Sequence, residues 1–140
     1  MNSRAQTLRV LLQGVGTDIE RCRRMVRLLE AQFQAALRHD PAEMSEASQG
    51  ITELVEHMDE TRRSRVAAVR ALLGEGGTVQ RVIERLDGPQ RQALETGWRM
   101  LEELVRESKR LNVRNCELLM AQHALMQRVL HGEGETYEPA

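Results

Sequence analysis

The stretch that decides the fold is LRVLLQGVGTDIERCRRMVRLLEAQFQAA, residues 8–36. Within it, nine positions spaced alternately by four and three residues are all apolar. In a chain that is 41% hydrophobic, the probability that this happens by chance is about 0.0003 for one heptad register and about 0.002 for all seven registers together. A strict alternation of four and three keeps one helix face apolar and is typical of a coiled coil. We therefore predict one long amphipathic helix over residues 3–39. The nine apolar positions, spaced alternately by four and three, are Leu8, Leu12, Val15, Ile19, Cys22, Val26, Leu29, Phe33 and Ala36.

Two glycines leave the continuity of this helix open. Gly14 and Gly16 each cost about 1 kcal/mol inside a helix, and residues 17–20, Thr-Asp-Ile-Glu, have the order of a capping box that could begin a new helix. Because the apolar positions on either side of the glycines keep the same phase, we favour one helix that is softened at this point.

A second helix is predicted over residues 41–73. Asp40 has the residue type of an N-cap and Pro41 suits the first helical position, while Gly74 ends the apolar pattern in the manner of a C-cap. So short a connection makes the first two helices antiparallel neighbours.

Two more helices complete the predicted fold. Thr78 can cap a short helix over residues 78–86, and Asp-Gly-Pro at 87–89 separates it from a last long helix over residues 89–131. We expect an all-α, antiparallel bundle of coiled-coil-like amphipathic helices. Residues 1–131 would form a single domain, and residues 132–140, with two glycines, a proline and three glutamates, a flexible tail.

The composition narrows the class of protein. Aromatic residues are only 2% of the chain and the formal net charge is −1, which gives no overall attraction to nucleic acid or to anionic lipid. Cys22 and Cys116 lie far apart in the sequence and are expected to be reduced. The N-terminus lacks the apolar region of a signal sequence, and no apolar run approaches a membrane span. We predict a cytoplasmic protein that neither inserts into membranes nor binds nucleic acid.

No pattern of residues predicts catalysis, a cofactor or a metal site. Catalytic nucleophiles need a base within hydrogen-bond reach, but the histidines and cysteines are scattered over separate segments. His57 could share a helical face with Glu53 and Glu60, yet no Glu-x-x-His motif of helical metal sites occurs, so a solvated histidine is favoured. Arginines gather at residues 21–27 and 62–65; a solvated or internally paired face is favoured there over phosphate binding, because aromatic interleaving is absent.

The last predicted helix carries more apolar residues than one narrow seam needs. Trp98, Val105, Leu119 and Met126 widen a row that contains Leu104, Leu111, Leu118 and Leu125. An uncovered part of so wide a stripe would form a docking surface for an amphipathic helix of another protein. Thioethers adapt to imperfect partners, but for the methionines at 100, 120 and 126 the favoured interpretation is that they fill gaps in a core.

Asn112 and Asn115 are polar residues near this row. Buried amides are tolerated in helical seams where they fix register or bind a backbone. The alternative, that the side chain faces water, is weaker for Asn115, which lies in the row itself.

The run LNVRNCELL at residues 111–119, late in a long final helix, resembles the FlgN family of flagellar export chaperones. The order of helices agrees over nearly the full length, including the RALLG ending of the second helix at residues 70–74. The resemblance implies a chaperone without ATPase activity that binds the C-terminal helical segments of the hook-filament junction proteins and delivers them to the flagellar export gate. We predict that these cargo proteins bind at Leu104, Leu111, Asn115, Leu118 and Leu125, and that Tyr137 docks on the export gate.

A different class of function stays open at this stage. The same apolar stripe suits a structural coiled-coil adaptor or a self-associating scaffold unrelated to export, and a homodimer is compatible with it. Copurification with junction proteins would separate the two interpretations.

Overall fold

The computed structural model describes residues 3–137, with side chains through residue 132, and this part of the chain consists of four α-helices. They are α1 (Arg4–Leu37), α2 (Pro41–Leu73), α3 (Val79–Arg85) and α4 (Gly88–Tyr137). The all-α prediction is confirmed, and the predicted bounds of α2 are matched at both ends. The predicted tail, residues 132–140, falls mostly outside the described side chains, and the backbone of α4 continues to Tyr137.

Local capping interactions fix the starts of the first three helices. Ser3 and Gln6 form a capping box at α1, with Ser3 Oγ accepting from the Gln6 amide at 3.1 Å. Asp40 Oδ1 accepts from the backbone amide of Glu43 at 3.1 Å, and Thr78 begins α3 in the same way. Each cap satisfies a backbone N–H that has no partner within its own helix.

Helix α1 passes through Gly14 and Gly16 without a break, as the phase of its apolar residues predicted. A Cβ at Gly14 would lie 3.5 Å from Thr61 Cγ2, an ordinary contact, and a Cβ at Gly16 would meet nothing within 4 Å. Packing therefore does not require glycine at either position, and tertiary contacts on both sides of the pair hold the helix together.

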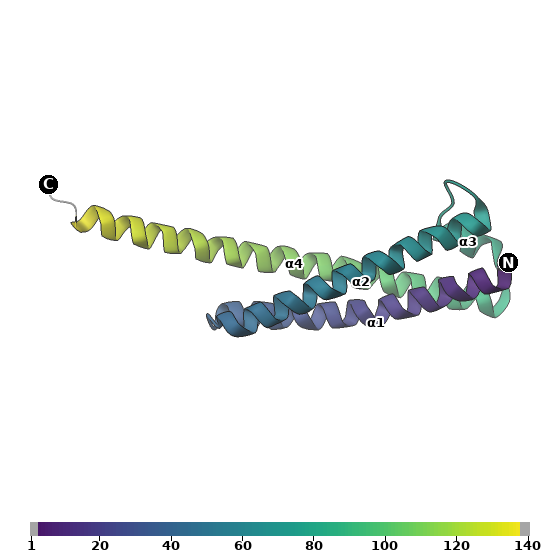
Figure 1. Ribbon diagram of the computed structural model, residues 1–140, viewed down its shortest axis with the longest axis horizontal. Helices are drawn as coiled ribbons and strands as arrows, with labels where there is room; N and C mark the ends of the chain where they lie inside the picture. The colour runs from purple at the N-terminus through teal and green to yellow at the C-terminus, as the bar shows by residue number, and fades with distance from the viewer. Residues whose placement is uncertain (1–2, 138–140) are drawn as a thin grey trace.

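Helix α1 is the central element of the bundle. Both α2 and α4 pack along it, whereas the backbones of α2 and α4 do not approach each other directly in the described part of the chain. The connection through α3 reverses the chain a second time, so α4 runs antiparallel to α2 and parallel to α1 (Figure 1). Gly97 marks the close approach of α4, because a Cβ there would lie only 3.2 Å from Val15 Cγ1.

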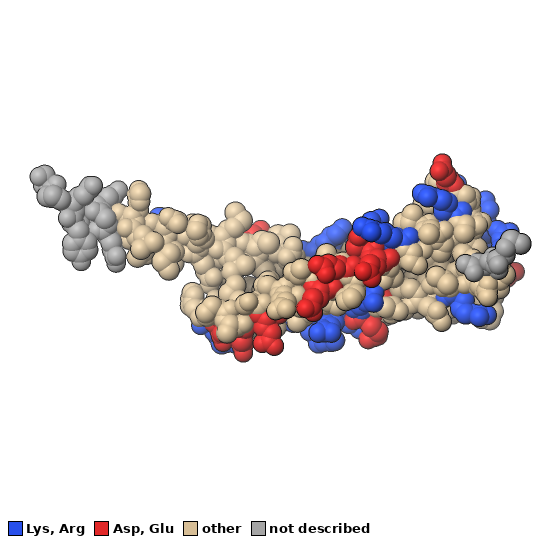
Figure 2. All heavy atoms as spheres, viewed as in Figure 1, with Lys and Arg blue, Asp and Glu red and all other residues tan. Residues whose placement is uncertain are grey.

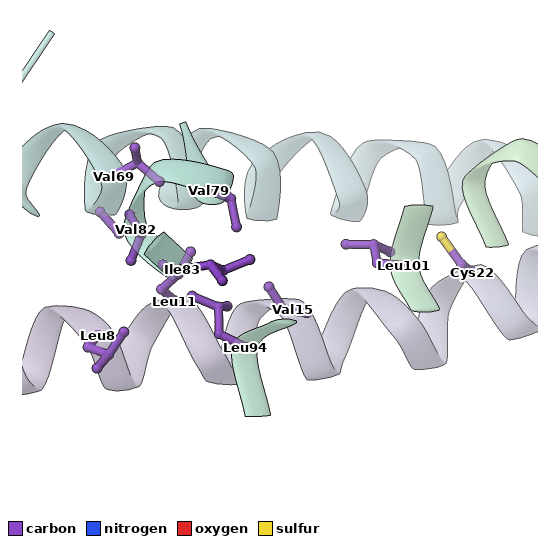
Figure 3. Packing of buried hydrophobic residues seen from close by; sticks show 11 residues of the cluster. Leu8, Leu11, Val15, Cys22, Val69, Val79, Val82, Ile83, Leu94 and Leu101 are labelled. Atoms are coloured by element: carbon purple, nitrogen blue, oxygen red, sulfur yellow. The ribbon is translucent and has the colours of Figure 1, made fainter. Parts of the chain in front are cut away.

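The larger of two core clusters lies at the end of the bundle that α3 covers. It joins residues from all four helices around Leu11, Ile83 and Leu94, whose exposed fractions are 1%, 1% and 0%. Their side chains converge between α1, α3 and α4 (Figure 3). A smaller cluster, toward the tip of the α1–α2 hairpin, consists of Met25, Leu29, Leu54 and Leu111.

Helix α1 buries a wider surface than its predicted stripe. Five of the nine predicted positions are buried and four are half-buried, but Leu11, Asp18 and Met25 are buried as well. These three lie beside the stripe on the helical surface. A helix that packs against neighbours on two sides needs this broader face.

Asp18 makes a buried ion pair that the sequence pattern did not predict. Its Oδ2 lies 2.8 Å from an Arg65 guanidinium nitrogen, and the Arg21 guanidinium is 4.0 Å from the other oxygen. The Arg65 guanidinium also stacks 5.3 Å from the centroid of the Trp98 ring. Burial raises the pKa of Asp18 above its ordinary value, against the opposing effect of Arg65. Asp18 thus links α1 to α2.

Candidate partner-binding site

The candidate site is the apolar stripe of α4, followed from its packed part to its free end. Leu94, Leu101 and Leu111 are 0%, 4% and 3% exposed, so the first half of the stripe is buried. It packs on α1, and Leu111 joins Met25 and Leu29 in the smaller core cluster. This half of α4 contributes to the core of the bundle.

Asn115 fastens α4 to α1 through its side-chain amide. Its Nδ2 donates to the backbone oxygen of Leu29 at 2.7 Å and to Gln32 Oε1 at 2.8 Å, and the residue is 2% exposed. Its Oδ1 accepts from Arg114 Nε at 3.2 Å. The amide is fully used inside the bundle, which agrees with the prediction that Asn115, more than Asn112, is a buried seam residue. Asn112 is exposed.

Arg114 reinforces the same attachment from the rim. Its guanidinium carbon lies 3.7 Å from the centroid of the Phe33 ring, and one guanidinium nitrogen lies 3.0 Å from Glu30 Oε2. Hydrogen bonds from Gln34 and Arg114 lower the pKa of the exposed Glu30 carboxyl. The attachment combines hydrogen bonding, charge and stacking within two turns of α1.

Gln122 makes a further cross-helix hydrogen bond, about two turns along α4 from Asn115. Its Nε2 donates to the backbone oxygen of Ala36 at 3.0 Å, and α1 ends one residue later, at Leu37. Both this bond and the Asn115 bond join residues 86 positions apart, so the two parallel helices keep one register. Helix α4 then projects beyond the α1–α2 hairpin (Figure 1). We call residues 123–132 the overhang.

The overhang carries the stripe onward without a covering helix. Leu118, Leu125 and Val129 follow at intervals of seven and four residues, which keeps them on the face that includes Leu111. Leu118 is half-buried, whereas Leu125 and Val129 are 58% and 48% exposed. Met126 and Leu130, both more than half exposed, flank this face. Aliphatic residues at these helical positions form an apolar strip that fits the apolar face of another helix.

The five residues predicted to bind cargo therefore lie in three different environments. Leu111 and Asn115 are buried against α1, Leu104 and Leu118 are half-buried, and Leu125 is exposed. Their role in binding stays a prediction. The side chain of Tyr137 lies outside the described residues.

The methionines of α4 do not fill gaps in the core. Met100, Met120 and Met126 are 38%, 71% and 58% exposed, so the favoured interpretation, that they fill gaps in the core, was wrong. Leu130 was missing from the predicted stripe. The end of α1 near residue 37 could be predicted from the sequence. Which residues of α4 lie beyond that end, and are therefore exposed, depends on the register between the two helices, which the sequence did not show.

The described residues also bear on other classes of site. Within residues 3–132, no group of three or more His, Cys, Asp or Glu side chains is arranged to hold a metal ion. His57, Glu53 and Glu60 are all exposed on α2. In the same part of the chain, no helix combines the length and apolar character needed to cross a membrane.

Most arginines of the two predicted clusters have protein partners. Arg21 donates to Thr61 Oγ1 at 2.6 Å and Arg23 to Glu20 at 2.6 Å, while Arg62 and Arg63 both contact Asp59. Together with Arg65, they support the interpretation of an internally paired face.

Comparison with known families gives one match. The family model described as FlgN protein matches residues 1–132. Neither the curated proteins nor the solved structures include a match to this chain.

Proposed function

Because the chain belongs to the FlgN family, a family of flagellar export chaperones, we propose that it binds the C-terminal helical segments of hook-filament junction proteins in the cytoplasm and delivers them to the export gate. The observation that carries this proposal is the apolar stripe of α4, which continues past the end of α1 into the exposed overhang. A stripe of this kind stabilises a helix that has no partner of its own by covering its apolar face.

We propose that the cargo helix follows the track of α1. Leu125 and Val129 lie on the face that α1 covers nearer the start of α4, so a helix placed end to end with α1 would pack on them in a similar way. The amides of Asn115 and Gln122 mark where α1 occupies this track. The cargo would thus replace the missing continuation of α1.

The size of the overhang sets how strongly it can bind by itself. Four apolar side chains, Leu125, Met126, Val129 and Leu130, are each about half exposed, and complete burial of a side chain of this kind contributes about 1.5–3 kcal/mol. Covering the exposed halves would contribute roughly 3–6 kcal/mol, which is no larger than the cost of about 4 kcal/mol or more that association imposes through lost translational and rotational freedom. Tight binding therefore requires more surface, and the half-buried Leu118 and Leu104 are the nearest to supply it.

The predicted residues Leu111 and Asn115 would take part only if α4 separated from α1. Asn115 would first lose its two hydrogen bonds to α1, each of which contributes about 1 kcal/mol net. In this proposal cargo docks first on the overhang, and separation of the buried part follows with a longer cargo segment.

The test replaces exposed residues only. The double variant Leu125→Asp/Val129→Asp should keep its helix content and lose binding to the C-terminal segments of the junction proteins, measured by isothermal titration calorimetry. Met120→Asp is the matched control, because Met120 is 71% exposed and lies two residues after Leu118, about 200° around the helix. Undiminished binding by the double variant, or equal loss in the control, would contradict the proposed surface.

The delivery step is assigned to the C-terminal residues. Deletion of residues 132–140, which include Tyr137, should spare cargo binding and impair secretion of the junction proteins. Equal loss of both activities would argue against a separate docking role for Tyr137.

The exposed face of the overhang also bears on the alternative of a self-associating scaffold. Two copies could cover each other's overhang, in which case the Leu125→Asp/Val129→Asp variant would change from dimer to monomer in light scattering. A wild-type chain that is monomeric alone and binds junction segments one to one would favour the chaperone.

A further inference from the structure

A second apolar recess lies at the opposite end of the molecule from the overhang. It is enclosed by the start of α1, the end of α2, α3 and the start of α4, and Gln90 of α4 lies on its wall. Gln90 precedes Leu125 by 35 positions, which is about 50 Å along a helix. One ligand helix docked on the overhang would leave this recess free.

The recess has an apolar floor and a basic rim. The floor includes Leu8 and Val82, which are 6% and 3% exposed, and the walls include the half-buried Leu72, Leu73 and Leu86. Arg4 and Arg85 line the rim. Arg4 donates to the backbone oxygen of Leu72 at 3.1 Å, and no carboxylate among residues 3–132 pairs with it.

The arginines at this end differ from those along the rest of the bundle. Within the described residues, the side chains of Arg9, Arg70, Arg81, Arg85 and Arg91 show no ion pair or hydrogen bond, whereas those near the middle of the molecule are mostly paired with carboxylates. Basic side chains are spread over the end that carries α3, whereas basic and acidic side chains lie close together near the middle of the molecule (Figure 2). Exposed cations without partners attract an anionic ligand.

We propose that this recess, with Arg4 and Arg85 at its rim, binds an acidic peptide segment of a partner protein through one apolar anchor side chain and flanking carboxylates. The charge and shape of the site both point to a peptide. The apolar surface is recessed between helices, so a single protruding side chain can enter it, whereas a flat anionic membrane would need protruding apolar residues. Leu72, Leu73 and Leu86 are half-buried and line the recess. Because cargo binds at the overhang in our proposal, the chain could bind this partner and the cargo at the same time.

The experiment uses the full chain and a fluorescein-labelled heptapeptide, Glu-Glu-Glu-Leu-Glu-Glu-Glu, followed by fluorescence anisotropy. A matched peptide with glutamine in place of every glutamate tests the charge. Binding of the acidic peptide should weaken as the salt concentration rises from about 0.1 M to about 1 M, because the screening length falls from about 10 Å to about 3 Å.

Two double variants locate the binding. Arg4→Gln/Arg85→Gln should weaken binding of the acidic peptide about fivefold or more, while Arg24→Gln/Arg27→Gln, which removes the same charge from exposed positions on α1, should change it less than twofold. Circular dichroism should show equal helix content in both.

Three results would overturn the proposal. These are equal binding of the acidic and glutamine peptides, equal loss in the two double variants, and absence of binding by the acidic peptide at millimolar concentration. Vesicles that contain an anionic phospholipid provide the remaining comparison, and binding of vesicles instead of the peptide would assign the site to a membrane. Because the overhang is unchanged in every variant, cargo binding measured in parallel distinguishes failure here from failure of the proposed chaperone function.

Discussion

The buried pair of Asp18 and Arg65 provides a quantitative test of how α1 and α2 are held together. Asp18 and Arg65 have side chains that are 4% and 17% exposed, and their charged atoms are 2.8 Å apart. Replacing Arg65 by Ala would leave the Asp18 carboxyl inside the bundle with a weakened set of partners. Removing one member of a buried pair is strongly destabilising, because the other charge has lost its hydration and its counter-ion.

The surroundings of the pair make the expected loss of stability in Arg65→Ala smaller than the loss expected for a completely buried pair. Removing a partner from a completely buried pair costs about 3–5 kcal/mol. Here Arg21 stays within 4.0 Å of the carboxylate and is itself 30% exposed, so part of the charge interaction survives. We expect Arg65→Ala to lower the free energy of unfolding by about 2–3 kcal/mol.

A second variant separates the charge from the packing. The pKa of Asp18 is raised mainly by burial, despite Arg65, so the ion pair does not fully offset the cost of desolvation. Replacing both residues by apolar side chains, Asp18→Leu/Arg65→Met, should therefore leave stability within about 1 kcal/mol of the wild type. Methionine would keep a contact with the ring of Trp98.

Urea unfolding followed by circular dichroism at 222 nm measures both effects. A loss below about 0.5 kcal/mol in Arg65→Ala would mean that the carboxyl is hydrated in solution. A double variant less stable than Arg65→Ala would show that the pair is net stabilising and would refute the reasoning from desolvation.

Three more predictions follow from single side chains. Asn115→Ala should lower the free energy of unfolding by about 1–3 kcal/mol in urea, because Gln32 loses its buried partner, whereas the exposed Asn112→Ala should change it by less than about 0.5 kcal/mol. The pKa of Asp18 is raised in the folded state, so over a range of pH the folded chain keeps this proton while the unfolded chain has released it. The free energy of unfolding should therefore fall as pH rises from about 4 through the folded pKa. The Asp18→Asn variant should lack that part of the pH dependence. Burial raises the pKa of Cys22 to about 11, so a thiol reagent at pH 8 should modify the exposed Cys116 and leave Cys22 unmodified until the chain unfolds; two equally reactive thiols in the native chain would contradict the buried position.

Much of the fold could be predicted because its determinants are local. The caps at Asp40 and Thr78 act within one turn of the chain, and the apolar period of α1 extends without interruption across two glycines. Such features are visible in the sequence because the residues that interact are neighbours in it. The family resemblance drawn from residues 111–119 was also sound, since the FlgN model matches residues 1–132.

Asp18 shows what local reasoning could not identify. In the sequence it follows Thr17, the first residue of a possible capping box, and the phase of the neighbouring apolar residues favoured a continuous helix instead. In the structure it is 3% exposed and pairs with Arg65, 47 positions away. No short-range pattern identifies that partner, because it depends on how α2 lies against α1.

The sequence by itself determined that α4 has a wide apolar stripe, but not which part of it is available to a partner. Leu111 and Leu125 are the same residue type at equivalent positions, two heptads apart, yet they are 3% and 58% exposed. Only the tertiary structure decides between them, because α4 runs parallel to α1 in the register fixed by Asn115 and Gln122, and α1 ends at Leu37. An apolar side chain is buried only where a neighbouring helix is present to cover it, and the length of that neighbour is set elsewhere in the chain.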